Sequence, residues 1–357
     1  MTLVNIATAL AVGLAPVAAP VPLTLPGPTG PYSVGTVELH LVDHDRPDPW
    51  AAGRAREVMV SLWYPALPHG HRQRHLPAAV AAHYDQVEVP KVGIPPGTAD
   101  LAGTRSHSRV AALPLPGDRP VVVYSPGGGN SRFFGTTLVE DLASRGYVVI
   151  GIDHTPASPV RFPDWFVPPG SGVDMAQVLR ERVRDTSFVL DRLAPVVDTS
   201  RVGMFGHSIG GFTAAEAMVT EPRIAAGVNM DGSMGAAYGQ AATVGVTRPF
   251  LLMGGGLTSG RPHNHAHSPD WRSFWENSTG WQRDVYLPDA EHGSFNDAQV
   301  LLPQLDGDFD AAIGTVDPRE SLSAQRTYLA AFFDLHLRGR PTTVFDRPAS
   351  PVVELVP

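Results

Sequence analysis

Gly206-His207-Ser208-Ile209-Gly210-Gly211 is the stretch that decides how this chain folds, because it places the pattern G-x-S-x-G between a strand-like and a helix-like segment. The run 201–205 before it is apolar like a buried strand, and 212–219 after it is rich in helix formers. A sharp turn here strains the serine and projects its hydroxyl outward, so the residues two before and two after must be glycine-sized. The stretch therefore predicts a nucleophile elbow, with Ser208 as the nucleophile above a helix N-terminus.

A serine nucleophile needs a base, and the base needs an acid that holds its tautomer. His292 is the predicted base, because it follows the strand-like segment 282–287 and opens the loop Glu291-His292-Gly293-Ser294-Phe295. His336 lies in an amphipathic segment, 322–337, and is expected to be a helix-face residue.

Asp231 is the predicted acid, because it ends the apolar run 224–230 and precedes Gly232. The next apolar run, 249–253, is followed by glycines, threonine and serine, which supply no carboxylate. Asp270 and Asp289 remain as alternatives, the second as an expected turn residue.

Stabilising the oxyanion of a tetrahedral intermediate requires two N–H donors. Ile209, directly after the nucleophile, supplies one. The other is expected from Gly128, with Gly129 next, in the glycine-rich loop after the strand-like run 120–124. No G-K-[ST] follows this loop, so it is not a phosphate-binding loop.

The pattern along the chain predicts an α/β fold with a mostly parallel central sheet and helices on both faces. We expect two antiparallel first strands, followed by strands that alternate with helices. The expected strands are 35–42, 57–64, 121–124, 147–153, 202–205, 225–230, 250–253 and 284–287. The expected helices are 78–84, 134–144, 174–193, 210–219, 269–276 and 322–337. Residues 31–357 are expected to form a single catalytic domain after an apolar segment, 1–30.

These motifs resemble the platelet-activating-factor acetylhydrolase family of α/β-hydrolases, of the plasma and intracellular type II kind, and its bacterial members. The resemblance rests on these segments: 58–65, 123–129, 142–149, Asp153-His154, the elbow, Asp231 and 292–295. It implies an α/β-hydrolase fold with the acid after the strand that follows the elbow. One position departs from the family pattern S-H-G, because Pro126 stands where the histidine is common. Bacterial relatives include general esterases and lipases, and some related hydrolases attack polyesters.

Composition excludes several function classes. The formal net charge of −8 and the lack of a basic run argue against nucleic-acid binding. The chain has no cysteine, which excludes disulfides, thiol nucleophiles and thiolate metal sites.

The first residues are apolar and alanine-rich, and Val17-Ala18-Ala19 is a candidate signal-peptidase site. No basic residue precedes Arg46, so a charged leading region is missing, and Pro16, Pro20 and Pro22 argue against a membrane-spanning helix. We expect a secreted protein with a degraded secretion signal, and a disordered arm on a cytoplasmic protein is the alternative.

Two loops are expected to shape the substrate pocket. The loop 155–172 carries Phe162, Trp165 and Phe166, which together with Gly129 and Trp271 are the candidate substrate-binding residues; packing under a long loop is the alternative. The other loop, 257–275, contains His263, His265 and His267. No carboxylate is spaced with them and the chemistry needs no metal, so no metal or other cofactor is predicted. His154 and His207 are expected to be buried hydrogen-bonding residues.

Together these features predict a serine carboxylic-ester hydrolase that uses Ser208, His292 and Asp231 and forms an acyl-enzyme. The expected substrates are short to medium acyl or lipid-like esters. A polyester or aryl-ester hydrolase, and an acyltransferase with the same triad, are alternatives.

Overall fold

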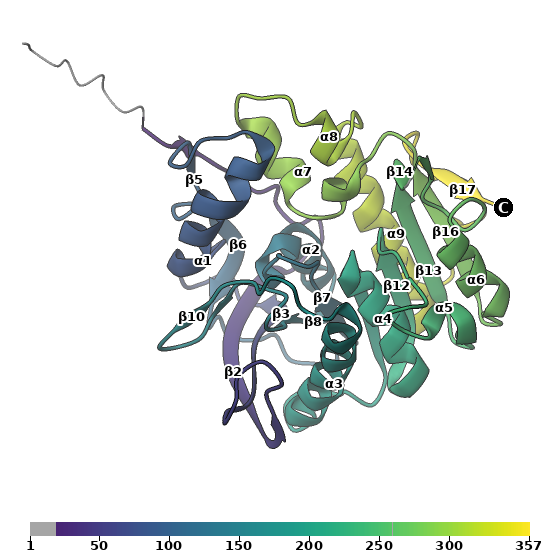
Figure 1. The fold of residues 1–357 in the computed structure, drawn as a ribbon, viewed down its shortest axis with the longest axis horizontal. Helices are drawn as coiled ribbons and strands as arrows, with labels where there is room; N and C mark the ends of the chain where they lie inside the picture. Colours follow the sequence, from purple (N-terminus) through teal and green to yellow (C-terminus); the bar gives the residue numbers. More distant parts are fainter. Residues whose placement is uncertain (1–18, 259) are drawn as a thin grey trace, which may run out of the picture.

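A mixed β-sheet forms the centre of the protein in the computed structural model, which describes residues 19–258 and 260–357 (Figure 1). Its strands are β2 (Ser33–Pro47), β3 (Ala55–Ala66), β4 (Arg72–Arg74), β6 (Arg105–Val110), β7 (Val121–Ser125), β8 (Val148–Asp153), β11 (Val202–His207), β12 (Ile224–Met230), β13 (Phe250–Gly255), β16 (Gln282–Leu287) and β17 (Glu354–Val356). They lie in the order β17-β16-β13-β12-β11-β7-β8-β3-β2-β6-β4. The strands from β8 to β16 pair in parallel, whereas β3 and β17 pair antiparallel with the ends of this run.

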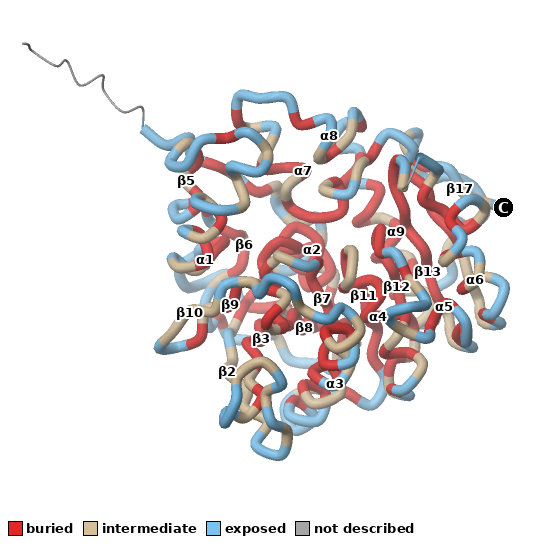
Figure 2. Tube along the Cα trace, in the orientation of Figure 1, coloured by how far each residue is buried: buried red, intermediate tan, exposed pale blue. Residues whose placement is uncertain are grey.

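Helices cover both faces of the sheet, and the pleat of β7 shows how the two cores are separated. Val122 and Tyr124 belong to one buried apolar cluster, and Val121 and Val123 to the other. The first cluster is closed by α1 (Ala78–His83), α2 (Thr136–Ser144) and α9 (Pro318–Arg338), and the second by α3 (Met175–Leu193), α4 (Ile209–Thr220) and α6 (Pro269–Asn277). Burial is continuous along the parallel strands, which appear red in Figure 2. Because both faces of these strands are covered, their sequences are apolar runs and do not alternate between apolar and polar residues.

The remaining elements are short. They are three two-stranded ribbons, β1 (Val21–Pro22) with β5 (Ala99–Asp100), β9 (Val160–Arg161) with β10 (Phe166–Val167) and β14 (Leu257–Thr258) with β15 (Arg261–Pro262); the helices α5 (Ala241–Val244), α7 (Ala298–Leu301) and α8 (Asp310–Ile313); and the helical turns η1 (Tyr84–Glu88), η2 (Val89–Val92), η3 (Arg132–Gly135), η4 (His292–Phe295) and η5 (Leu302–Gln304). Among the described residues no helix is both long and apolar enough to cross a bilayer.

The sequence predicts the parallel strands and long helices but misses β4, β6 and β17. In β6 the inward-facing residues are Ser106 and Ser108, so its buried face is polar and carries no apolar alternation. β17 has only three residues, too few for a pattern. All three lie at or near an edge of the sheet, where fewer apolar neighbours are needed.

The described part of the N-terminal segment packs against the catalytic domain. Residues 19–30, which the sequence analysis assigns to the apolar segment 1–30, include β1, and the side chains of Leu23 and Leu25 are buried in the first cluster. Most of the candidate cleavage site Val17-Ala18-Ala19 and the leading residues lie outside the described residues.

A buried carboxylate ties the chain after β16 to α2. Asp297 Oδ1 accepts hydrogen bonds from the N–H (3.1 Å) and the hydroxyl (2.6 Å) of Thr137, and the Asp297 N–H donates to the carbonyl of Phe134. Burial raises the pKa of Asp297 to about 7, although these hydrogen bonds act in the opposite direction. The folded protein therefore holds this carboxyl in its neutral form below neutral pH.

We expect Asp297→Asn to become progressively more stable than wild type as pH rises from 4 to 8. A folded pKa above the unfolded one stabilises the fold below the unfolded pKa, and this contribution is lost as pH rises through the folded value. The amide does not titrate, so the difference in unfolding free energy should grow by about 2–4 kcal/mol across this range. Urea denaturation at each pH measures it. The exposed control Asp346→Asn should show no such trend; equal slopes for both variants would contradict the assignment.

Candidate active site

Ser208 lies at the junction of β11 and α4 with a backbone φ of 57°. This is the left-handed region, which is strained for a serine. The crossing of β11 and α4 is so close that a Cβ on Gly206 would lie 2.2 Å from the carbonyl carbon of Gly210, and α4 lies so close to β7 that a Cβ on Gly210 would lie 1.9 Å from the carbonyl oxygen of Ser125. The predicted elbow geometry is therefore present, and its two glycines are sterically required.

Asp231 and His292 come together across the carboxyl ends of β12 and β16. His292 Nδ1 lies 2.5 Å from Asp231 Oδ2, and both residues line the same pocket as Ser208. Asp231 is itself anchored, because its N–H donates to the carbonyl of Met253 (2.8 Å) and its Oδ1 accepts from the N–H of Gly255 (3.1 Å). Because an ionised carboxylate can only accept, His292 Nδ1 is the donor in this contact, and no described residue bonds to Nε2 of His292.

A second histidine binds the same carboxylate. His263 Nδ1 lies 2.7 Å from Asp231 Oδ1, and its ring packs on that of Trp271 with 4.2 Å between the centroids. Burial alone would raise the pKa of Asp231, but hydrogen bonds from His263 and His292 outweigh it and hold this pKa well below its usual range. The sequence placed His263 among the histidines that follow Ser208 and suggested it as a possible metal ligand, but the alternation of histidines did not indicate a contact with Asp231.

His207 fixes the loop that carries the predicted base. Its Nε2 donates a hydrogen bond to the carbonyl oxygen of His292 at 3.0 Å, and the two rings lie 4.5 Å apart. Burial lowers the pKa of His207 to about 3, so its ring is neutral at working pH. The sequence prediction of a buried hydrogen-bonding residue is confirmed for His207.

The alternative acids Asp270 and Asp289, and the other histidines named from the sequence, do not take the positions of Asp231 and His292. Asp270 lines the pocket, but its Oδ2 accepts from the N–H of Met234 at 2.5 Å and no described histidine bonds to it. His336 lies on α9 and packs against Trp281. The three histidines of 263–267 bind different partners: His265 bonds to Asp284 and His267 to Asn264. Asp289 accepts backbone hydrogen bonds through its carbonyl and does not line the pocket.

Gly128 lies beside Ile209, the residue that follows Ser208. A Cβ on Gly128 would lie 3.8 Å from Ile209 Cγ2, and the N–H of Ile209, at the first position of α4, has no partner within the helix. Gly129 differs, because its N–H donates to the carbonyl of Ala157 at 2.7 Å. Of the two glycines considered from sequence, the structure leaves Gly128 as the available donor.

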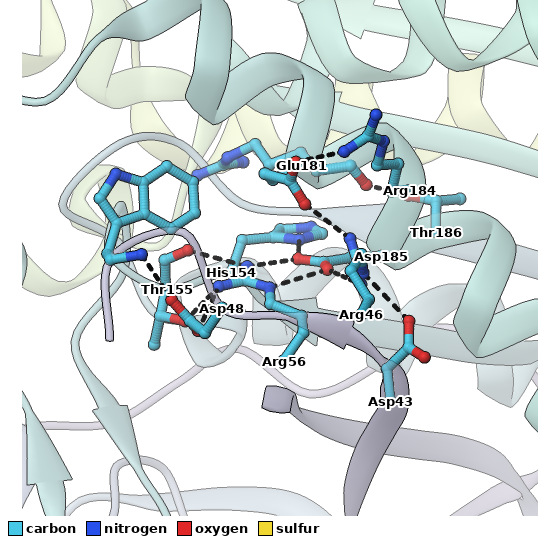
Figure 3. A network of polar contacts seen from close by, with 12 residues as sticks. Asp43, Arg46, Asp48, Arg56, His154, Thr155, Glu181, Arg184, Asp185 and Thr186 are labelled. Carbon is cyan, nitrogen blue, oxygen red and sulfur yellow. Dashed lines mark hydrogen bonds and ion pairs between the residues drawn. The ribbon is translucent and has the colours of Figure 1, made fainter. Parts of the chain in front are cut away.

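A buried polar network contacts the glycine-rich loop, and Figure 3 shows the part of this network around Asp185. Arg182 donates to the carbonyl of Pro126 at 2.7 Å, and His154 Nε2 lies 3.3 Å from Ser125 Oγ. His154 Nδ1 in turn lies 3.0 Å from Asp185 Oδ2, confirming the prediction that His154 is a buried hydrogen-bonding residue.

Asp185 is the centre of that network. Arg56 donates to both of its carboxylate oxygens, at 3.0 and 2.6 Å, and Arg46 reaches Oδ1 at 2.5 Å. Burial would raise the pKa of Asp185, but Arg56 and the hydrogen bond from His154 hold it far below its usual range. The carboxylate therefore stays ionised and links α3, the β2–β3 pair and the chain after β8.

The pocket above Ser208 has a volume of about 550 Å³, within the range of small-ligand sites. Its apolar wall comes from α3, α4 and the loops after β12 and β13: Met175, Leu179, Ile209, Phe212, Tyr238 and Leu257. Its polar lining includes Asp270 and Glu291, and among the described lining residues there is no lysine or arginine.

The aromatic residues selected from sequence do not line this pocket. Phe162 and Trp165 stack on each other with centroids 4.8 Å apart, and both line a separate hollow beside Trp50. Phe166 packs against His83, and Trp271 is fully buried, donating through Nε1 to the carbonyl of Gly232. The loop 155–172 folds against the β2–β3 pair instead, so a location after a parallel strand did not suffice to place its side chains in the pocket.

The fold and this site define an α/β-hydrolase that cleaves carboxylic esters, and comparison with known proteins agrees. The chain belongs to the family described as platelet-activating factor acetylhydrolase, isoform II, whose family model matches residues 103–161 and 173–341. The expected fold and family are confirmed.

Several relatives are esterases by name. A probable 1-alkyl-2-acetylglycerophosphocholine esterase of Arthroderma benhamiae is 27% identical over 93% of each chain. The platelet-activating factor acetylhydrolase of Gallus gallus is 26% identical over 47% of this chain and 37% of its own length. The solved ferulic acid esterase of Streptomyces cinnamoneus is 37% identical, with a TM-score of 0.78 over 94% of this chain and 99% of its own.

Replacing His263 should test its role as a positioning residue for Asp231. We expect His263→Leu to lower kcat about tenfold or more with little change in KM, because the carboxylate loses one of its hydrogen bonds and its burial is no longer balanced. His263→Asn keeps a donor near the Nδ1 position and should recover part of the loss. Steady-state kinetics on a soluble ester measures both variants.

His267→Leu, in the same loop but bonded to Asn264, is the matched control and should retain wild-type kinetics. If His263→Leu and His267→Leu lower kcat equally, His263 supports the loop rather than the carboxylate.

Proposed function

We propose that this protein is a serine carboxylic-ester hydrolase that uses Ser208, His292 and Asp231 and passes through an acyl-enzyme. The observation that carries the proposal is the 2.5 Å contact between His292 Nδ1 and Asp231 Oδ2 in the pocket that also contains the strained Ser208. In this arrangement Ser208 can act as the nucleophile, His292 as its base and Asp231 as the acid that orients His292.

In the acylation step, Nε2 of His292 takes the proton of the Ser208 hydroxyl while Oγ forms a bond to the ester carbonyl carbon. The carbonyl oxygen gains the negative charge, and the N–H groups of Gly128 and Ile209 donate to it. Asp231 stabilises the imidazolium. The carbon–alkoxy bond then breaks, and His292 gives its proton to the departing alcohol.

Water completes the cycle by the same route. His292 takes a proton from water, the hydroxide oxygen bonds to the acyl carbon, and Ser208 leaves with the proton from His292. An acyltransferase would admit an alcohol instead of water at this step. With methanol added, hydrolysis releases the carboxylic acid and acyl transfer forms the methyl ester, so measuring both products distinguishes a hydrolase from an acyltransferase.

For the substrate we propose a short to medium acyl or lipid-like ester without net negative charge near the scissile bond. The six apolar residues of the pocket wall favour an apolar acyl or alkyl portion, and Asp270 and Glu291 disfavour an anionic one. The relative from Arthroderma benhamiae, named as an esterase of 1-alkyl-2-acetylglycerophosphocholine, supports a lipid ester.

An aryl ester is the second candidate. The ferulic acid esterase shares more identity with this chain than the named lipid esterases do, and Tyr238 and Phe212 offer aromatic contacts in the pocket. Rates on matched acetate, butyrate, octanoate, oxidised phospholipid, polyester film and methyl ferulate would rank the candidates. Export from the cell, predicted from the leading residues, stays a prediction.

We expect Ser208→Ala to lower kcat by about 10⁴-fold or more, because it removes the nucleophile without altering the packing of the elbow. Asp231→Asn should lower kcat severely with a smaller change in KM, since it disturbs the tautomer of His292. Asp270→Asn, which changes a carboxylate in the same pocket, is the control and should be mild. Activity within about tenfold of wild type in Ser208→Ala would refute the triad.

Substrate selection should depend on Tyr238 rather than on Trp165. We expect Tyr238→Ala to raise KM for octanoyl or aryl esters about fivefold, equivalent to about 1 kcal/mol for a half-exposed ring, while acetate changes little. Trp165→Ala should leave both unchanged, because its ring lies in a separate hollow. The opposite outcome would assign acyl binding to the loop 155–172.

A further inference from the structure

Four arginines lie on the paired strands β4 and β6 at one edge of the central sheet, and a fifth lies beside them on β9. In the pairing of β4 with β6, Arg72 lies opposite Arg109 and Arg74 opposite Arg105, and Arg161 on β9 borders the same hollow. We call these five residues the arginine face. Sequence analysis found no basic run because the five lie in three separate segments, which only the fold brings together.

The arginine face has no acidic counterpart. Among the described residues, no carboxylate forms an ion pair with any of the five, although the chain carries 35 acidic residues. Like charges directly opposite each other in a sheet are destabilising. The arrangement therefore costs stability, and nothing in the packing of the sheet requires it.

Backbone contacts hold the guanidinium groups in place without neutralising them. Arg72 Nε donates to the carbonyl of Ser106 at 2.7 Å, Arg74 to that of Ala102 at 2.8 Å and Arg109 to that of Gly70 at 2.6 Å. Each of these guanidinium groups keeps further N–H donors for a ligand.

The nearby acids are already engaged. Glu38 Oε2 pairs with Arg132 at 2.6 Å and its Oε1 accepts from Gln73, while the buried Glu140 accepts from Ser108. The face borders a hollow of about 440 Å³ that also includes His71 and shares no lining residue with the catalytic pocket. The charge of this hollow is thus positive on a protein whose net charge is −8.

Exposed aliphatic side chains adjoin the arginine face. Val110 lines the hollow, and the N–H of Val110 bonds to the carbonyl of His71. Leu67 and Leu113 follow at the same edge, joined by a backbone hydrogen bond, and are 42% and 58% exposed. Single-stranded nucleic acids are usually bound on exposed aromatic platforms, whereas cations beside aliphatic chains suit a lipid interface.

We propose that the arginine face is a docking surface for an anionic lipid layer. The five guanidinium groups bind lipid phosphates, and Leu67, Val110 and Leu113 contact the interfacial region. Such docking would hold the enzyme at a layer that contains lipid-like esters, although the binding itself requires neither Ser208 nor turnover.

Co-sedimentation with vesicles tests the proposal, comparing pure phosphatidylcholine with a mixture containing 30% phosphatidylglycerol. Wild type and Ser208→Ala should both bind the mixed vesicles and not the neutral ones, and binding should weaken as salt rises. The double variant Arg74→Gln/Arg105→Gln should lower the partition coefficient at least tenfold. Arg74→Lys/Arg105→Lys keeps the charge and should retain most of the binding.

The matched control is Arg192→Gln/Arg319→Gln, which removes two exposed arginines outside the face and should bind like wild type. Hydrolysis of a soluble acetate ester by every variant except Ser208→Ala checks that the fold is intact. Equal loss in the control, or equal binding to neutral vesicles, would overturn the proposal.

Two further outcomes would also overturn it. Binding of wild type to heparin without binding to mixed vesicles would assign the face to a soluble polyanion. Aggregation of Arg74→Gln/Arg105→Gln, with no vesicle binding by wild type, would show that the arginines only protect an exposed sheet edge.

Discussion

The close crossing of β11 and α4 is the constraint on which the active site depends. Ser208 can hold a φ of 57° only because its N–H bonds to the carbonyl of Met230 and because backbone atoms approach Gly206 and Gly210 more closely than any side chain permits. The strain is local, whereas the packing that maintains it extends across β7, β11 and β12. The hydroxyl of Ser208, the proposed nucleophile, is thus positioned by the sheet rather than by its own side-chain contacts.

Two buried carboxylates divide the remaining work. Asp231 lies between two histidines and orients the proposed base, while Asp185 lies between arginines and His154, and His154 contacts Ser125 at the start of the glycine-rich loop. Each is ionised because its partners outweigh the effect of burial on its pKa. Removing one partner of such a group leaves an uncompensated charge, so these networks act by fixing geometry more than by adding stability.

The sequence predicted the parallel strands, the elbow and the positions of Asp231 and His292, because each depends on local pattern and on chain order. It could not predict His263 beside Asp231, since that contact depends on how the chain after β13 folds back. The prediction that Trp165 lines the pocket was wrong, because the place of its side chain likewise depends on how the loop after β8 folds. The sequence could not predict the arginine face, because the residues of β4, β6 and β9 become neighbours only in the folded protein.

In the proposed triad the acid, Asp231, follows β12, so the loop after β13 does not have to supply it. That loop contributes Leu257 to the pocket wall and His263 to the contact with Asp231, but none of the three side chains that we propose to react. Its length and composition between Leu257 and Pro262 are therefore open to evolutionary change at small catalytic cost, provided that His263 returns to the same place. Divergence in substrate preference among relatives should accumulate in this segment, while the elbow and the proposed acid and base stay fixed.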